Sequence, residues 1–227
     1  MELLTSRVIE GLSRVPASSR FIVGIVGFPG AGKSTLSGGL VEAVNAVLPK
    51  GQRAQILPMD GYHLPNEILD NLGLRPLKGI PDTFDAEGFV GLLEKVRQVP
   101  PQFLSAPAFD RTIDGSIAGA IKIDPDVRVI VTEGNYLLHD QGKWRDIAGL
   151  LDDSWFLDTS LEIIRPRLIA RHVEGGRSEE EAIAKVESTD LPNARLIEKT
   201  RCRARAIVRA VSNSGQGSAL HYDIADQ

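Results

Sequence analysis

The stretch Gly27-Phe28-Pro29-Gly30-Ala31-Gly32-Lys33-Ser34 decides the fold of this chain. It contains a glycine, four further residues and then Gly-Lys-Ser, which is the pattern of a phosphate-binding loop. The apolar run Phe-Ile-Val-Gly-Ile-Val at residues 21–26 precedes it and is typical of a buried strand in a parallel sheet. A helical pattern of apolar residues follows from Lys33. Strand, loop and helix in this order are the setting that the pattern requires, so the stretch predicts a nucleoside-triphosphate site.

Each residue type in the loop has a chemical task in such a site. Glycines let backbone N–H groups turn inward around phosphate oxygens, and the N-terminus of the following helix adds its positive end. The lysine reaches the β- and γ-phosphates, and the serine hydroxyl binds Mg²⁺. We therefore expect the nucleotide and Mg²⁺ to be held by residues of the loop and of the first helical turn, namely Gly27, Pro29, Gly30, Ala31, Gly32, Lys33, Ser34 and Thr35.

Strand-like apolar runs alternate with segments of helical periodicity, which predicts an α/β fold with a three-layer, doubly wound and mostly parallel sheet. We expect a single domain over residues 1–227, with strands at 21–26, 54–59, 127–132, 154–157 and 206–211. A helix is expected at 2–14.

Polar residues and a proline provide signals for three further helices. Asp85 is placed to cap a helix, and Ser178 with Glu181 forms a capping-box pair. Pro166 lies inside a helical segment that reaches His172, so we expect this helix to be kinked or to begin later than its periodicity suggests.

Composition excludes several classes of protein. The chain has 227 residues, 42% hydrophobic and 25% charged, with a net charge of −4 and one cysteine. These values fit a globular protein without disulfides, and they argue against a dedicated nucleic-acid binder. Neither a membrane span nor a signal peptide is recognisable, so a cytoplasmic protein is expected. Whether it is a monomer or a homodimer stays open.

Acidic residues follow two of the predicted strands. Asp60 comes after the strand at 54–59, and Glu133 comes after the strand at 127–132. Ligands of open α/β sheets bind at the carboxyl ends of the strands, so both acids are expected to face the γ-phosphate if the strands are neighbours. One carboxylate would serve Mg²⁺ and the other would accept a proton from an attacking hydroxyl. Two long stretches rich in Pro and Gly, 61–84 and 100–126, are expected to be irregular walls of an acceptor pocket.

The motifs together resemble the P-loop small-molecule kinases, the family of uridine kinase, type I pantothenate kinase and phosphoribulokinase. The resemblance rests on the phosphate loop, on Met59-Asp60-Gly61-Tyr62-His63 and on Thr132-Glu133-Gly134-Asn135. The segment Lys78-Gly79-Ile80-Pro81-Asp82-Thr83-Phe84-Asp85 resembles the Lys-Gly-x-Pro segment of the pantothenate-kinase branch. Pro107-Ala108-Phe109-Asp110-Arg111 resembles the acceptor-site stretch of the family. Asp190-Leu191-Pro192-Asn193-Ala194-Arg195 resembles a bacterial subgroup described as kinases of a fructose transport system. The likeness extends over about residues 21–211.

The resemblance implies a P-loop NTPase fold with a small helical lid at about 165–190, and ATP as the nucleotide. It makes Asp60 the catalytic base, and Lys33 is a further catalytic residue. It places the lid arginines Arg167, Arg171 and Arg177 over the phosphates, and Arg171 and Arg177 are the catalytic candidates. Glu133 is the acid that binds either Mg²⁺ or the acceptor molecule. The expected acceptor-binding residues are Tyr62, His63, Arg111, Glu133 and Asn135.

The function that follows is an ATP-dependent transfer of the γ-phosphate to a hydroxyl of a small metabolite. A sugar such as fructose or a pantothenate-like alcohol is the expected acceptor, and a nucleoside or nucleotide is the alternative. A regulatory ATP-binding module without acceptor chemistry is the alternative of another class. A GTPase switch is disfavoured, because the sequence has no Asn-Lys-x-Asp motif.

Overall fold

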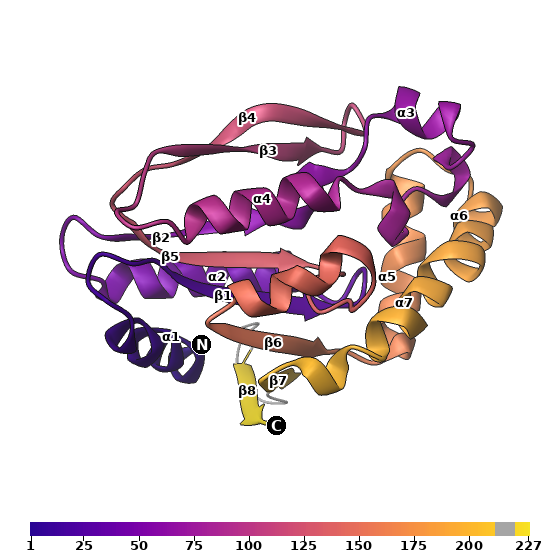
Figure 1. Ribbon diagram of the computed structural model, residues 1–227. Helices are drawn as coiled ribbons and strands as arrows, with labels where there is room; N and C mark the ends of the chain where they lie inside the picture. Colours follow the sequence, from indigo (N-terminus) through magenta and orange to yellow (C-terminus); the bar gives the residue numbers. More distant parts are fainter. Residues whose placement is uncertain (212–220) are drawn as a thin grey trace.

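A six-stranded sheet forms the centre of the protein in the computed structural model, which describes residues 1–211 and 221–227 (Figure 1). Its strands are β1 Phe21–Gly27, β2 Arg53–Pro58, β5 Val127–Gly134, β6 Asp153–Asp158, β7 Ala206–Val211 and β8 His221–Asp226. They lie in the order β2-β5-β1-β6-β7-β8, and every neighbouring pair is parallel except β7–β8. The predicted mostly parallel α/β sheet is confirmed.

Strand β1 lies in the interior of this sheet, between β5 and β6. All seven of its residues are buried, which explains why its sequence is an uninterrupted apolar run. Strand β5 separates β1 from β2, and its Glu133 pairs with Ile25 on one side and with Pro58 on the other. The three strand ends that carry sequence motifs are therefore neighbours at one edge of the sheet.

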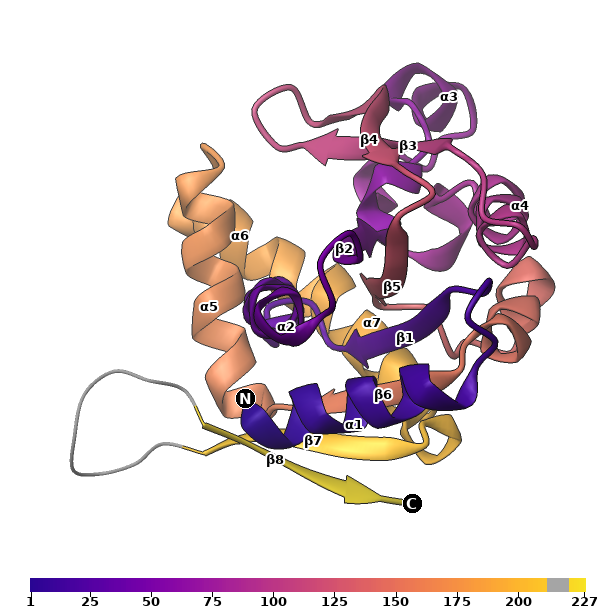
Figure 2. The same ribbon diagram turned by 90° about the vertical axis from the view of Figure 1, so that its left-hand side faces the viewer.

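Helices cover both faces of the sheet, with α1 and α2 on one side and α4 and the short helix η4 on the other (Figure 2). The α-helices are α1 Glu2–Arg14, α2 Lys33–Val47, α3 Asn66–Asn71, α4 Ala86–Val96, α5 Leu161–Glu174, α6 Glu179–Lys185 and α7 Leu191–Glu198. Short helices are η1 Met59–Tyr62, η2 Arg75–Leu77, η3 Pro81–Thr83, η4 Gly142–Leu150, η6 Arg201–Arg203 and the π-helical turn η5 Val186–Asp190. Within residues 1–211 and 221–227, no helix has the length and apolar character needed to cross a membrane.

The helix starts predicted from polar residues are found in the structure. Asp85 accepts a hydrogen bond from the Gly88 N–H at the start of α4. Ser178 and Glu181 form the reciprocal capping box at the start of α6. Helix α5 begins at Leu161 and runs on through Pro166.

The prediction that residues 100–126 are irregular was wrong. Strands β3 Leu104–Asp110 and β4 Gly115–Ile123 form an antiparallel hairpin, a second sheet separate from the first. Alanine, glycine and proline make up three of the seven residues of β3 and four of the nine of β4, and these residues carry little strand signal in a sequence. Pro107 lies where the register of the pair shifts, which is where a sheet tolerates a residue without an N–H.

Strand β8 was not predicted either, since 206–211 is the last strand expected from the sequence. Its residues alternate, with Tyr222 buried and its neighbours exposed, but six residues at the edge of a sheet give a weak pattern. In the core, Trp144 and Trp155 are buried as expected.

Candidate active site

The phosphate loop has the backbone that its glycines permit. Gly30 and Gly32 have φ angles of 76° and 99°, a region that side chains other than glycine rarely adopt. A Cβ atom at Gly30 would lie 3.2 Å from the side chain of Leu168, so helix α5 packs directly on the loop. The loop is therefore enclosed between the sheet and α5.

Lys33 turns back into the loop. Its Nζ donates hydrogen bonds to the carbonyl oxygens of Gly27 at 3.0 Å and Phe28 at 2.9 Å, and to Asn135 Oδ1 at 2.7 Å. Burial lowers the pKa of Lys33, while the charges of Glu133 and Asp60 oppose that shift. Asn135, expected among the acceptor-binding residues, thus holds the loop lysine in this structure.

Ser34 and Glu133 form the pair expected for a magnesium site. The Ser34 hydroxyl donates to Glu133 Oε1 at 2.8 Å, and Glu133 is 7% exposed. Mg²⁺ in kinases is held by few protein oxygens together with nucleotide phosphates, so a hydroxyl beside a carboxylate fits this ion. Burial raises the pKa of Glu133, and Asp60 adds to the increase, whereas Lys33 lowers it. The described residues contain no cluster of three His, Cys, Asp or Glu side chains that could hold a metal, so the protein would supply few ligands at this site.

Asp60 lies across β5 from the phosphate loop. It belongs to η1, two residues after the Pro58 that pairs with Glu133. Its charge acts on Lys33, on Glu133 and on Arg171 of α5. Among the described residues no side chain hydrogen-bonds to or ion-pairs with its half-buried carboxylate, since its hydrogen bond to His63 uses the backbone oxygen. A carboxylate in this state can accept a proton or orient a hydroxyl group.

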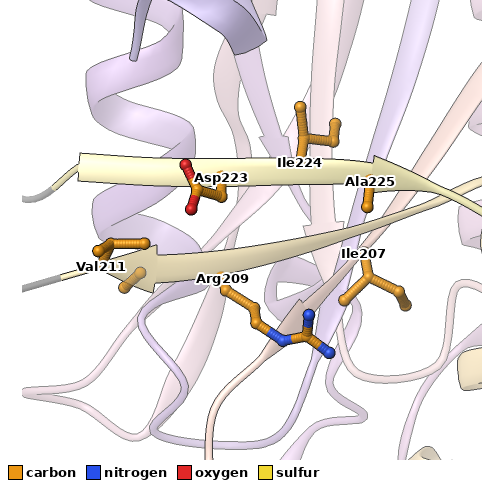
Figure 3. A pocket seen from close by; sticks show the side chains of 7 residues that line it. Ile207, Arg209, Val211, Asp223, Ile224 and Ala225 are labelled. Carbon is orange, nitrogen blue, oxygen red and sulfur yellow. The ribbon is translucent and has the colours of Figure 1, made fainter.

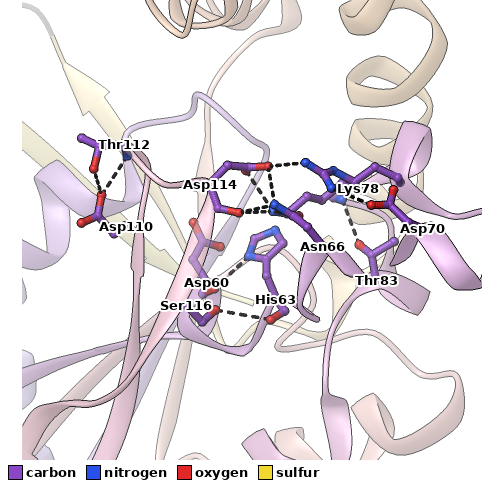
Figure 4. A network of polar contacts seen from close by, with 12 residues as sticks. Asp60, His63, Asn66, Asp70, Lys78, Thr83, Asp110, Thr112, Asp114 and Ser116 are labelled. Atoms are coloured by element: carbon purple, nitrogen blue, oxygen red, sulfur yellow. Dashed lines mark hydrogen bonds and ion pairs between the residues drawn. The ribbon is translucent and has the colours of Figure 1, made fainter. Parts of the chain in front are cut away.

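His63 forms an aromatic wall next to Asp60. Its ring centroid lies 4.0 Å from that of Phe84 and 4.7 Å from that of Phe109, and its Nδ1 is 2.8 Å from the Asp60 backbone oxygen (Figure 4). Burial lowers the pKa of His63, so the ring is neutral at pH 7. Tyr62 instead packs into the core against Phe89, with ring centroids 5.0 Å apart, and burial raises its pKa to about 12.

The candidate lid arginines do not all face the same way. Arg171 is exposed along much of its surface, yet desolvation by surrounding atoms and the like charge of Arg111 lower its pKa, while Asp60 and Glu133 oppose this. Arg167 reaches to 3.5 Å from the Gly30 oxygen. The structure therefore places Arg171 and Arg167 by the phosphate loop.

Arg177 points elsewhere in this structure. Its Nη1 donates to His172 Nδ1 at 2.9 Å, and His172 Nε2 lies 2.7 Å from Asp190 Oδ2 in η5. A histidine that accepts at Nδ1 carries its proton on Nε2 and donates it to the aspartate. His172 therefore links two parts of the α5–η5 segment, a role that the sequence did not suggest.

Contacts between α6, α7 and the segment 75–80 were not predicted. Lys185 donates to the carbonyl oxygens of Pro76 at 2.8 Å and Lys78 at 3.3 Å. Tyr136 and Asn193 both donate to the Gly79 oxygen, at 2.5 and 3.3 Å. The motifs at 78–81 and 190–195 were visible separately in the sequence, but nothing in it indicated that they meet.

A surface groove lies away from these residues. A groove of about 370 Å³ runs along β7 and β8, lined by Ile207, Arg209, Ala210, Val211, Asp223, Ile224 and Ala225 (Figure 3). None of the predicted site residues lines it, so it belongs to the edge of the sheet and not to the candidate active site.

Several kinases are similar to this chain in sequence and fold. A protein of Schizosaccharomyces pombe that is provisionally named a uridine kinase is 34% identical over 202 residues, which are 86% of this chain and 84% of that protein. An ATP-dependent kinase-like protein of Aspergillus versicolor is 37% identical over 159 residues, 66% of this chain and 92% of that protein. A structure from Silicibacter sp. TM1040, provisionally named a fructose transport system kinase, has a TM-score of 0.77 and 39% identity, covering 86% of this chain and 94% of that one. No protein-family model matches the chain.

Proposed function

The chain belongs to the P-loop kinases of small molecules, the family that includes uridine kinase and pantothenate kinase, and from this we propose its reaction and its acceptor. It transfers the γ-phosphate of Mg-ATP to a hydroxyl group of a small metabolite, which is a sugar such as fructose or a pantothenate-like alcohol. The observation that carries the proposal is the meeting of Asp60, Glu133 and the loop residues Lys33 and Ser34 at the ends of three neighbouring strands.

Each of these residues has a distinct task in the proposed reaction. Lys33 leaves its carbonyl partners and neutralises the β- and γ-phosphates. Ser34 and Glu133 hold Mg²⁺, directly or through water, and the ion when bound neutralises phosphate charge. Asp60 orients the acceptor hydroxyl and takes its proton as the phosphoryl group leaves the nucleotide.

The arginines of the α5–α6 segment complete the site. Arg171, whose charge interacts with those of Asp60 and Glu133, stabilises the charge on the transferring group, because a guanidinium can bind two phosphoryl oxygens at once. Arg177 contributes in the same way after it leaves His172, when the segment closes over the phosphates.

A screen for ADP release tests the proposal. Purified protein and Mg-ATP are incubated with sugars, nucleosides and vitamins, and each product is identified by mass spectrometry. We expect one compound class to raise ADP formation well above the rate without acceptor. Lys33→Met, which keeps the length of the side chain but removes its charge, is the control and should abolish the increase.

Two outcomes would contradict the proposal. ADP release that no acceptor raises, together with normal ATP binding, would make the protein a nucleotide-binding module. A phosphorylated nucleoside with no turnover of sugars or vitamins would keep the kinase but replace the acceptor class.

A further inference from the structure

The turn that joins β3 to β4, residues 111–114, is fixed at its first end. Asp110 Oδ1 accepts hydrogen bonds from the Thr112 N–H at 2.8 Å and from the Thr112 hydroxyl at 2.6 Å (Figure 4). These bonds lower the pKa of the Asp110 carboxyl. Asp110 thus shapes the turn through its side chain, and Arg111 is the residue that follows it.

The other end of the turn is fixed by Asp114, which has a positive φ of 47°. Lys78 Nζ lies 2.9 Å from Asp114 Oδ1 and donates to its backbone oxygen at 2.7 Å, while Asn66 donates to the same backbone oxygen at 3.0 Å. Arg75 adds a weaker ion pair to Asp114 at 3.7 Å. Asp114 therefore has an uncommon backbone conformation that several contacts stabilise. Such conformations occur most often at functional sites.

Strand β3 brings this turn to the acceptor side of the cleft. The backbone of Pro107 touches Gly61 so closely that no Cβ would fit there, and the Phe109 ring packs on His63. The turn therefore continues from residues that adjoin Asp60.

Arg111 is the charged side chain of this turn that remains free. Among the described residues it makes no ion pair and no side-chain hydrogen bond, and it is exposed. Its charge nevertheless acts on buried Glu133 and on Arg171 across the cleft. An unpaired guanidinium on a turn fixed at both ends is preorganised to bind an anion, because little freedom is lost on binding.

The nucleotide phosphates already have cationic partners on their own side, in Lys33 and the arginines of α5. We propose that Arg111 binds a carboxylate or phosphate group of the acceptor, so that this kinase prefers hydroxyl compounds that carry a negative charge. The inference rests on the proposed function and narrows its acceptor class. A planar guanidinium matches either anion with two parallel hydrogen bonds.

Matched acceptor pairs test the inference. Glycerol is compared with glycerate for the carboxylate, and fructose with fructose 6-phosphate for the phosphate, within a panel of such pairs at fixed Mg-ATP. The measured quantity is the ratio of kcat/KM for the charged member to that for the neutral member. We expect a ratio well above one for at least one anion type, and that type identifies the group which Arg111 binds.

Variants assign the preference to Arg111. Arg111→Gln should lower the ratio by about 10–100-fold, as expected for the loss of a charge-assisted pair of hydrogen bonds, and Arg111→Lys should give an intermediate ratio. Lys122→Gln, on the exposed surface of the same hairpin, is the matched control and should leave the ratio unchanged.

The results that overturn the inference differ from those that overturn the proposed function. A preference for neutral acceptors, or a ratio that Arg111→Gln does not alter, refutes the inference and leaves the kinase intact. The second of these results would mean that another group accounts for any preference for charged acceptors. If no member of any pair is phosphorylated, the proposed function itself fails.

Discussion

Asp60 has no side-chain partner for its carboxylate among the described residues, which leaves the carboxylate available for the proposed role of proton acceptor. Asp60→Asn keeps the size of the side chain and should lower kcat by about 10²–10⁴-fold, the range for a positioned general base. The affinity for ATP should change little, which equilibrium binding can measure. The surface variant Asp146→Asn on η4 is the control, because it makes the same change from carboxylate to amide outside the candidate active site.

Magnesium titration distinguishes a second role for Asp60. If the carboxylate holds Mg²⁺ through water, high Mg²⁺ should restore much of the rate of Asp60→Asn. Full activity of the variant at ordinary Mg²⁺ would contradict both roles.

His63 makes the stability of the protein depend on pH. Burial between two phenylalanine rings lowers its pKa, so the unfolded chain binds a proton more readily than the folded protein does. As the pH falls through the ordinary histidine value of about 6.5, the free energy of unfolding should therefore decrease. Urea unfolding at pH 8 and pH 5.5 measures the difference.

His63→Asn should reduce that difference, because it removes the titrating ring and keeps an N–H donor. His139, whose pKa burial also lowers, would account for a remaining dependence. An unchanged pH dependence in His63→Asn would show that the ring is protonated in the folded state too.

The core residues of the site were predictable because each lies next to a strong pattern. Lys33 and Ser34 belong to the loop motif, and Asp60 and Glu133 directly follow apolar strands. The contact of Asn135 with Lys33 was not predictable, because it depends on how side chains pack inside the loop. The same holds for the link from Arg177 through His172 to Asp190, which joins the α5–α6 loop, α5 and η5.

At the scale of elements, helix α6 is connected to the acceptor side by Lys185. Lys185→Met should remove the hydrogen bonds to Pro76 and Lys78 and loosen the segment that supports the acceptor pocket. If acceptor binding becomes weaker by about 1 kcal/mol, the KM for the acceptor should rise about fivefold, with little change in the KM for ATP. Steady-state kinetics measures both constants.

The control for this variant is Lys199→Met, an exposed lysine just after α7. Equal changes in both constants for Lys185→Met would mean that α6 supports the nucleotide side instead.

Predictability also differed between elements. Helices with a polar cap and strands with β-branched runs were located from the sequence, because capping and burial leave local signals. The β3–β4 hairpin left none, since its strands consist largely of small residues and are stabilised by packing on η1. The order of the strands likewise depends on crossovers that no local pattern records.

At the scale of the whole molecule, Arg7 connects the first helix to two strands. Its guanidinium binds Asp153 of β6 at 2.6 Å and Asp226 of β8 at 2.5 Å, and Asp153 is nearly buried. Arg7→Met should lower the free energy of unfolding by about 1–3 kcal/mol, because it leaves a buried carboxylate with fewer partners. Asp153 keeps its bonds to Trp155 Nε1 and to the Ser154 N–H, which limits the loss.

Urea unfolding followed by circular dichroism measures this change. Arg14→Met is the matched control on the same helix, since within the described part of the chain Arg14 pairs only with exposed Glu10, and such pairs contribute about 0.3–0.5 kcal/mol. Equal losses in the two variants would mean that the buried position of Asp153 adds nothing.

The position of β5 between β1 and β2 has a consequence for how the chain is made. Both neighbours of β1 come late, since β5 begins at Val127 and β6 at Asp153. At about 5–20 residues per second, a ribosome needs roughly 5–20 seconds to proceed from the end of β1 to the start of β5. For that time the apolar strand Phe21–Gly27 has neither partner in the sheet, and unpaired apolar strands associate with other chains. A nascent chain of this kinase therefore needs protection by chaperones until more than half of it has been synthesised, and a fragment ending at residue 126 should be found in the insoluble fraction of the cell.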